Sequence, residues 1–188
     1  MLQRIDSIFH SLFVNPFRFK HFGRRSKLVA PMRLDGPQNI VVGNGVYVGY
    51  AVWLGAPSCG ISSSPLLQIG DGCRIGNFNH IYAVRKIVIE KDVLTADKVC
   101  ILDSRHGFED IDTPIWKQPV EPLSEVRIGE GSWLGEHVCI LGASVGKHCV
   151  IGANSVVTHD IPDYSVAVGM PAKIIKKFNF ETHRWEKI

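Results

Sequence analysis

Residues 69–81, with the sequence IGDGCRIGNFNHI, place an isoleucine at every sixth position, at Ile69, Ile75 and Ile81. Glycine follows the first two of these isoleucines. The same spacing extends on both sides of this stretch, so a six-residue repeat organises the chain. A repeat with a short, fixed period predicts a solenoid, in which successive units stack on one another.

The repeat continues through five triplets of positions that lie six residues apart. Fourteen of these fifteen positions are Ile, Leu or Val, and Thr95 is the exception. The triplets are Val42, Val48, Leu54; Ile69, Ile75, Ile81; Ile89, Thr95, Ile101; Ile128, Leu134, Ile140; and Val145, Ile151, Val157. Three units close one triangular coil, so the sequence predicts an all-β parallel solenoid of about five coils.

The residues around these positions predict short strands joined by tight turns. Side chains two residues earlier are mostly aliphatic or small, as at Ile40 and Val46, and such alternation is typical of a strand with one face inward. Pairs such as Asp71-Gly72 follow the strands and tolerate the positive φ of a tight turn. A β-sandwich would need turn signals every ~8 to 12 residues, so the solenoid is favoured.

The N-terminal segment, residues 1–39, precedes the repeat and is expected to cap the open end of the solenoid. Its apolar residues fall on one helical stripe, made of Ile5, Ile8, Phe9, Leu12 and Phe13. Residues 1–33 also carry seven Lys or Arg against one Asp. The same segment would therefore suit peripheral contact with an anionic membrane surface, although we favour the cap.

The repeat domain itself is expected to cover residues 40–172. Two stretches interrupt its period: a Ser- and Pro-rich excursion at 56–66 and a long inserted loop at 102–125. Long loops within a compact repeat are usually functional. Beyond the repeat, Pro171 is expected to open a short C-terminal helix over residues 173–188.

Composition indicates one globular domain. The 188 residues are 45% apolar and 21% charged, which disfavours disordered and collagen-like classes. No apolar run reaches the ~18 residues of a membrane-spanning helix, and the start lacks a signal-peptide layout, so we expect a cytoplasmic protein. The basic residues gather at the two chain ends without a recognition motif, which argues against nucleic-acid binding.

The cysteines are expected to be small apolar residues rather than ligands. There are five of them, at Cys59, Cys73, Cys100, Cys139 and Cys149, and no pair has CxxC spacing. An odd number without that spacing predicts neither a disulfide framework nor a structural metal site.

Three stretches in the last third carry a resemblance to a known family. Residues 128–136 read IGEGSWLGE, residues 151–162 read IGANSVVTHDIP, and residues 168–173 read VGMPAK. Over residues 40–177 the chain resembles the hexapeptide-repeat acyltransferases, in particular those that O-acetylate sugars and polysaccharides. The resemblance implies a left-handed parallel β-helix, a homotrimer with sites between subunits, and acetyl-CoA as co-substrate with no metal.

The resemblance also implies which residues would bind CoA. The pantetheine groove would be lined near Gly135, Glu136 and Ala153, and Thr158 and His159 would approach the nucleotide. Lys173 and Lys176 would face the phosphates as point charges. His159 stands where the family usually has lysine, which would weaken the attraction for phosphate near neutral pH.

His106 is the candidate general base. Acetyl transfer to an alcohol needs a base, and histidine with an unperturbed pKa of ~6.5 suits that task. His106 is the one histidine of eight that lies in the inserted loop directly after a coil, and its position matches the family pattern. The group that orients it stays open: Asp103 is near in sequence, and a backbone carbonyl would serve equally. The second histidine that the related carbonic anhydrases require five residues later is replaced by Ile111.

The acceptor is less well defined than the donor. Asn77 lies 29 residues before His106, where sugar acetyltransferases of the family have an asparagine that contacts the acceptor. The carboxylate that galactoside-type relatives carry about eight residues later is replaced by Arg85. O-acetylation of a sugar or glycan is the leading hypothesis. N-acetylation of a nucleotide-linked amino sugar and a non-catalytic scaffold are the alternatives.

Overall fold

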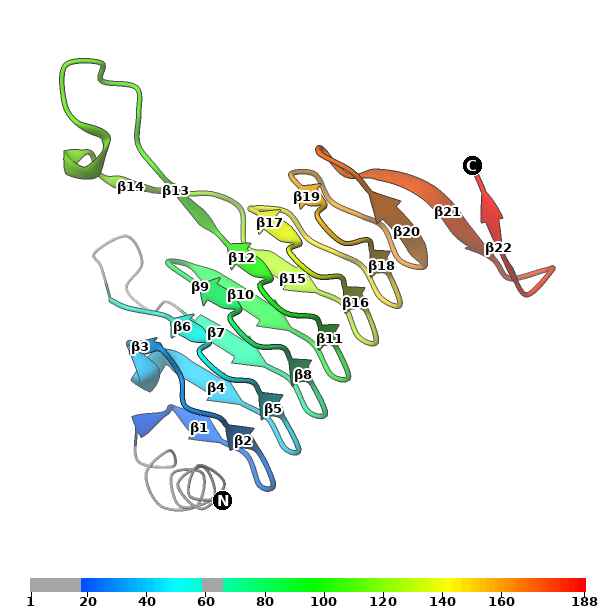
Figure 1. Ribbon diagram of the computed structural model, residues 1–188, viewed down its shortest axis with the longest axis horizontal. Coiled ribbons are helices and arrows are strands. Elements are labelled where there is room, and N and C mark those ends of the chain that lie inside the picture. Colours follow the sequence, from blue (N-terminus) through cyan, green and yellow to red (C-terminus); the bar gives the residue numbers. More distant parts are fainter. Residues whose placement is uncertain (1–17, 59–65) are drawn as a thin grey trace.

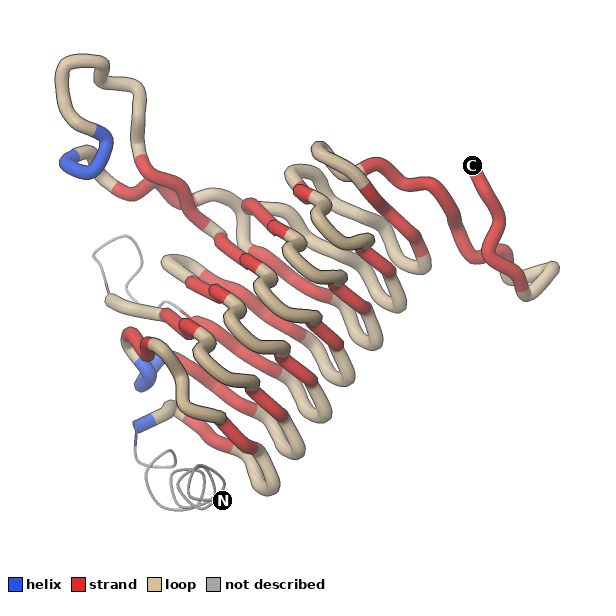
Figure 2. Tube along the Cα trace, viewed as in Figure 1, coloured by secondary structure: helices blue, strands red, loops and turns tan. Residues whose placement is uncertain are grey.

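Three faces of short parallel strands form a triangular prism in the computed structural model, which describes residues 18–58 and 66–188 (Figure 1). Each coil turns at three corners and contributes one strand to each face, except that the sixth coil joins face 1 only through a bridge at Val145. Figure 2 shows how strands and loops alternate along every coil. The predicted parallel solenoid is therefore confirmed.

The strands of the three faces are as follows. Face 1 contains β1 (His21–Phe22), β4 (Ile40–Val42), β7 (Leu66–Ile69), β10 (Lys86–Ile89) and β15 (Val126–Ile128). Face 2 contains β2 (Lys27–Leu28), β5 (Tyr47–Val48), β8 (Arg74–Ile75), β11 (Leu94–Thr95), β16 (Trp133–Leu134), β18 (Val150–Ile151) and β20 (Ser165–Val168). Face 3 contains β3 (Arg33–Asp35), β6 (Trp53–Gly55), β9 (His80–Tyr82), β12 (Cys100–Leu102), β17 (Cys139–Leu141) and β19 (Val156–Val157).

The core lies inside the prism and consists of the repeated aliphatic residues. On face 3, Ile81 pairs with Ile101 and Ile101 pairs with Ile140 in adjacent strands, and all three are fully buried. Identical spacing in successive coils stacks like side chains directly over one another, which is why a six-residue period suffices to build the core. Positive φ occurs at the expected turn positions, with 73° at Gly72 and 57° at Asp92.

Thr95 is the polar exception in the repeat, and it is buried. Its Oγ1 accepts a hydrogen bond of 3.1 Å from the Gly76 N–H, which also donates to the Thr95 carbonyl. We expect Thr95→Val to change the free energy of unfolding by less than ~1 kcal/mol, because the N–H keeps one acceptor. Urea unfolding measures the change, and a loss of ~2 kcal/mol or more would show that the hydroxyl is needed.

The solenoid begins one coil earlier than expected. Face 3 has six strands, so the described residues form six complete coils rather than about five, and an Ile161 bridge with β20 starts a seventh. The first coil, β1 to β3, lies within residues 1–39, which were expected to be only a cap. Phe22, Leu28 and Leu34 keep the six-residue spacing there. The repeat was not recognised in this coil because basic residues lie between these apolar positions. The helical stripe expected at Ile5 to Phe13 lies outside the described residues.

The expected C-terminal helix is wrong. Residues 173–188 instead form two strands, β21 (Lys173–Asn179) and β22 (Arg184–Lys187), and β21 pairs antiparallel with β20. The last coil leaves the edge of β20 unpaired, and backbone pairing to that edge outweighs the local helical preference. Burial alternates along β21, with Ile174 half-buried against the core and Lys173 exposed.

The insertion at 102–125 contains a two-stranded antiparallel ribbon rather than an irregular loop. Its strands are β13 (Ser104–His106) and β14 (Val120–Pro122), and a 3-10 turn, η3 (Ile115–Lys117), lies in the outer part. The ribbon projects from the corner between faces 3 and 1 (Figure 1). A second 3-10 turn, η2 (Pro37–Asn39), precedes β4. In the part of the chain that the structure describes, no helix is long and apolar enough to cross a membrane.

Candidate active site

His106 lies on β13, at the base of the projecting ribbon. It pairs with Val120 of β14, and the next residue, Gly107, donates its N–H to the Pro119 carbonyl at 2.9 Å. The His106 side chain is exposed. Within residues 18–58 and 66–188 its imidazole makes no hydrogen bond or ion pair, so both ring nitrogens are free for a substrate.

An ion pair stiffens the ribbon beside the imidazole. The Arg105 Nε lies 2.9 Å from the Glu121 Oε2 across the two strands. The Arg105 guanidinium also lies 4.8 Å from the centre of the Phe108 ring. Glu121 was not singled out from the sequence, because it meets Arg105 only through the antiparallel pairing of the ribbon, which the sequence analysis did not predict.

Asp103 fixes the point at which the ribbon leaves the prism. Its carboxylate is fully buried. Oδ1 accepts the Val84 N–H at 2.8 Å, and Oδ2 accepts the N–H groups of Arg85 and Lys86 at 2.8 and 2.7 Å. These three donors belong to the corner of the preceding coil. We call this arrangement, Asp103 with residues 84–86, the Asp103 clamp.

The returning strand of the ribbon is held at the same place. The Leu123 N–H donates to the Asp103 carbonyl at 2.7 Å, and the Arg85 Nη1 donates to the Leu123 carbonyl at 3.1 Å. The Asp103 carboxylate is occupied by backbone donors and therefore does not hold the His106 ring directly. It sets the direction of the strand that carries the ring.

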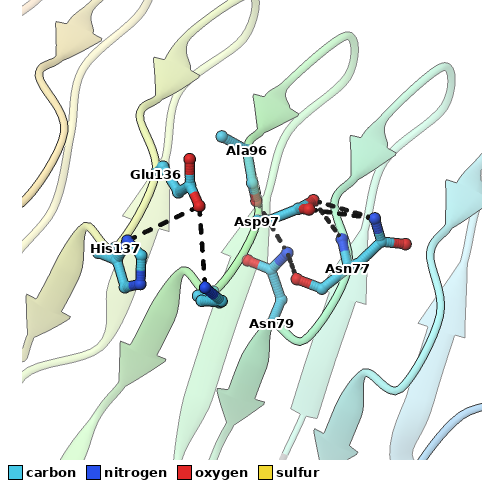
Figure 3. A network of polar contacts seen from close by, with 7 residues as sticks. Asn77, Asn79, Ala96, Asp97, Glu136 and His137 are labelled. Atoms are coloured by element: carbon cyan, nitrogen blue, oxygen red, sulfur yellow. Dashed lines mark hydrogen bonds and ion pairs between the residues drawn. The ribbon is translucent and has the colours of Figure 1, made fainter.

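Asn77 lies at the corner between faces 2 and 3, away from the ribbon. Its Oδ1 accepts the Tyr50 N–H at 2.9 Å, and its Nδ2 lies 3.1 and 3.2 Å from the two Asp97 carboxylate oxygens (Figure 3). The amide thus links three successive coils. In one chain, Asn77 supports this corner and does not lie beside His106.

Three of the expected CoA residues continue the same corner. Gly135 and Glu136 follow β16, and Ala153 follows β18 in the next coil, where the Asn154 N–H donates to the Glu136 carbonyl at 2.8 Å. A Cβ at Gly135 would lie 2.7 Å from the Ala153 nitrogen, so glycine is required for these coils to approach. Glu136 and Ala153 are exposed and can face a ligand along this edge.

The remaining expected CoA residues lie at the C-terminal end of the prism. Thr158 and His159 follow β19 at the corner between faces 3 and 1, and Thr158 Oγ1 lies 3.0 Å from His159 Nδ1. Lys173 and Lys176 lie on β21. The neighbouring Ala172 N–H donates to the Val156 carbonyl, which brings the start of β21 against the last full coil.

Within one chain, the expected site residues other than Lys173 and Lys176 on β21 therefore fall on two corners. His106, Thr158 and His159 lie between faces 3 and 1, whereas Gly135 and Ala153 lie between faces 2 and 3. The outer side of face 3 separates the two groups. Among the described residues, no group of three or more His, Cys, Asp and Glu side chains is placed to hold a metal ion.

The outer side of face 3 is an apolar and aromatic surface that the sequence reasoning missed. The Trp53 and His80 rings stack at 4.2 Å, Tyr82 packs edge-on against Trp53, and Trp53 Nε1 donates to Asp35 Oδ2 at 2.8 Å. Burial lowers the pKa of His80, so this imidazole is neutral at physiological pH and is not a competing cationic site. The signal was present, because from the second coil on the residues flanking the inward positions of face 3 are mostly apolar or aromatic, as at Trp53, Tyr82 and Leu102.

The chain is similar in sequence to known acyltransferases. The family described as "Hexapeptide repeat of succinyl-transferase" matches residues 125–159. Over 129 residues the chain is 41% identical to WbbJ of Escherichia coli K12, which is named for O-acetyl transfer in lipopolysaccharide biosynthesis. This match covers 65% of the chain and 66% of WbbJ, just under two thirds of that relative.

Two solved structures share the fold over most of the chain. A variant of AntD, an N-acyltransferase from Bacillus cereus in complex with dTDP and coenzyme A, superposes with a TM-score of 0.75 at 18% identity, covering 90% of each chain. A maltose O-acetyltransferase from Clostridium difficile 630 gives a TM-score of 0.53 at 29% identity, covering 88% of this chain and 73% of that one.

Proposed function

The chain belongs to the hexapeptide-repeat acyltransferases, with their left-handed parallel β-helix, and on that premise we propose that it moves an acetyl group from acetyl-CoA to a sugar hydroxyl. The acceptor would be a polysaccharide, a lipopolysaccharide or a glycan precursor. The observation that carries the proposal is the exposed imidazole of His106, which has no hydrogen-bond or ion-pair partner among the described residues and lies on a ribbon whose base is held by Asp103. The 41% identity to WbbJ supports the choice of a hydroxyl.

The proposed reaction is direct transfer in a ternary complex. The acceptor hydroxyl gives its proton to His106 and attacks the thioester carbonyl, while backbone N–H groups of the groove stabilise the oxyanion. As the carbon–sulfur bond breaks, His106 returns the proton to the departing CoA sulfur. Holding both substrates in one site removes the need for a covalent acetyl-enzyme.

A homotrimer is the proposed assembly, with each site between two subunits. The two corners of one chain support this arrangement, because His106 and the Gly135–Ala153 edge lie on either side of face 3. A neighbouring subunit would supply the missing corner, and Asn77 on that corner would then approach the acceptor. The cytoplasmic location and the membrane contact through residues 1–33 stay predictions.

N-acetylation of a nucleotide-linked amino sugar is the second candidate. The likeness to AntD, which was solved with dTDP and coenzyme A, favours it at the level of the fold. To decide, CoA release would be followed with a thiol reagent in the presence of matched sugars that differ in one hydroxyl or amino group. Faster release with the hydroxyl sugar supports the first proposal, and faster release with the amino sugar supports the second. If neither sugar caused CoA release and the protein did not bind acetyl-CoA, the scaffold hypothesis would remain.

Lys173 and Lys176 should contribute to CoA binding through their charge. We expect Lys173→Ala and Lys176→Ala each to raise the KM for acetyl-CoA by about two- to fivefold, as for exposed ion pairs. The effect should shrink in high salt, because salt screens exposed charges. Lys27→Ala, an exposed lysine on β2 in the first coil, is the control. An equal effect on an acetyl-thioester that lacks phosphates would contradict the assignment.

A further inference from the structure

A cavity of about 400 Å³ lies on the outer side of face 2, in the first three coils of the prism. Its lining residues come from all three coils: Arg25, Lys27, Gly45, Val46, Tyr47 and Arg74. Arg25 and Gly45 lie at the corner between faces 1 and 2, which is the corner opposite face 3. The subunit contacts proposed for face 3 therefore leave this cavity open to solvent.

Every charged side chain that lines the cavity is a cation. Among the described residues, Arg25, Lys27 and Arg74 form no ion pair with a carboxylate. By contrast, the Nζ of Lys91, at the same corner of the fourth coil, lies 3.0 Å from the Glu130 Oε1. Positive charge that no carboxylate of the chain neutralises attracts an anion from solution.

The Arg74 guanidinium is held in place by one of its nitrogens. Its Nη1 donates to the Gly45 carbonyl at 2.6 Å and to the Cys73 carbonyl at 3.4 Å. Its Nε and Nη2 groups have no hydrogen-bond partner in the part of the chain that the structure describes. These two N–H groups form one edge of the planar guanidinium, and such an edge matches two oxygens of a phosphate.

An aromatic ring lies between two of the cations. Lys27, Tyr47 and Arg74 are register partners in the adjacent strands β2, β5 and β8, so their side chains leave face 2 on the same side. Two strand spacings place the backbones of Lys27 and Arg74 about 10 Å apart. The Tyr47 ring is 40% exposed and offers an apolar surface with a hydroxyl group, which suits an organic group that carries a phosphate.

The corner beside the cavity carries an arginine where the next two coils have glycine. The Gly45 N–H donates to the Arg24 carbonyl, so Gly45 stacks over Arg25. Their φ angles are 59° at Arg25, 65° at Gly45 and 73° at Gly72, a conformation that glycine adopts with the least strain. No atom lies within 4 Å of the place where a Cβ of Gly45 would stand, so the cavity is open at this point.

We propose that this cavity binds a phosphate or pyrophosphate ester, with the phosphate on the free edge of Arg74 and the organic group against Tyr47. Arg25 and Lys27 supply further positive charge. The cavity has the size of a small-molecule site, for which ~300 to 1,000 Å³ is usual. The proposal does not depend on acetyl transfer, because the cavity and the lysines expected to bind CoA lie at opposite ends of face 2 (Figure 1).

Calorimetric titration of the full chain with inorganic pyrophosphate tests the proposal, and wild type should show saturable binding. Arg74→Ala should raise the Kd about tenfold or more, because charge-assisted hydrogen bonds are lost. Arg74→Lys keeps the charge without the planar edge and should still raise the Kd about threefold. Arg25→Gly should raise the Kd about two- to fivefold without lowering the free energy of unfolding in urea, since glycine fits this corner.

Matched variants separate this site from the proposed CoA site and from general surface charge. Lys27→Ala should raise the Kd for pyrophosphate about two- to fivefold and leave the KM for acetyl-CoA unchanged, whereas Lys176→Ala should do the reverse. Lys147→Ala removes an exposed lysine at the same corner of the sixth coil and should bind pyrophosphate as wild type does. These Kd values stay interpretable if no acetyl transfer is found.

A vesicle assay identifies the source of the ester. Flotation would compare phosphatidylcholine vesicles with and without phosphatidic acid. Binding that requires phosphatidic acid, is reversed by pyrophosphate and is lost in Arg74→Ala supports the site with a lipid headgroup as its ligand. Pyrophosphate binding without vesicle binding supports it with a soluble ester. The proposal is overturned if wild type does not bind pyrophosphate saturably, if Arg74→Lys binds as tightly as wild type, or if Lys147→Ala weakens binding as much as Arg74→Ala.

Discussion

Replacing His106 by alanine is expected to lower kcat for acetyl transfer by about 10²- to 10⁴-fold, the usual contribution of a general base. The imidazole is exposed and unpaired in the described residues, so its removal leaves no buried group unsatisfied. Stability and the affinity for acetyl-CoA should therefore stay near the wild-type values. Steady-state thiol release gives kcat, and calorimetric titration gives the Kd for acetyl-CoA.

His21→Ala is the matched control, since His21 is another exposed histidine on a short strand, in the first coil. It should leave kcat unchanged. If His106→Ala retained more than about a tenth of wild-type activity, the proton would have to be accepted elsewhere. The general-base role would then be abandoned even if the transferase activity stood.

Replacing Asp103 by asparagine is expected to lower the free energy of unfolding by about 3 kcal/mol. The amide offers one acceptor where the carboxylate offers two, and its own NH₂ group would face the N–H groups of Arg85 and Lys86. The substitution should also make the backbone at the base of the ribbon open more often. Urea unfolding measures the first effect, and hydrogen exchange at the Gly107 and Leu123 amides measures the second.

The control for Asp103 is Asp71→Asn. Asp71 accepts an N–H, from Asn44 at 2.7 Å, but it is exposed at a corner far from the ribbon. Asp71→Asn should lower the free energy of unfolding by less than about 1 kcal/mol and leave hydrogen exchange at the Gly107 and Leu123 amides unchanged. Should Asp103→Asn lower kcat with no faster exchange at these two amides, the Asp103 clamp would not be the means by which the carboxylate acts on His106.

The fold could be predicted from the sequence to the extent that the repeat was regular. Stacked identical positions such as Ile81, Ile101 and Ile140 make the period visible without knowledge of tertiary contacts. The first coil was missed because basic residues surround Phe22 and Leu28. The C-terminal strands were missed because β21 depends on the unpaired edge of β20, a feature that exists only once the prism is built.

A candidate site residue could be selected from the sequence where its position along the chain was enough to distinguish it. His106 could be singled out because it lies in the one long insertion directly after a coil. Asp103 could not be interpreted in the same way. Its partners are set by the stacking of coils, and the insertion about doubles the sequence distance between stacked neighbours, which is 20 from Ile81 to Ile101 and 39 from Ile101 to Ile140.

The pairing of β12 with β17 is in register, as if the residues between them were absent. The stacking of the coils therefore does not depend on the length of the segment inserted at this corner. A designer could shorten the ribbon, replace its tip or graft a segment from a relative while the scaffold folds unchanged. In the proposed enzyme, a change of acceptor would then require changes in this ribbon alone, while the coils proposed to bind acetyl-CoA keep their sequence.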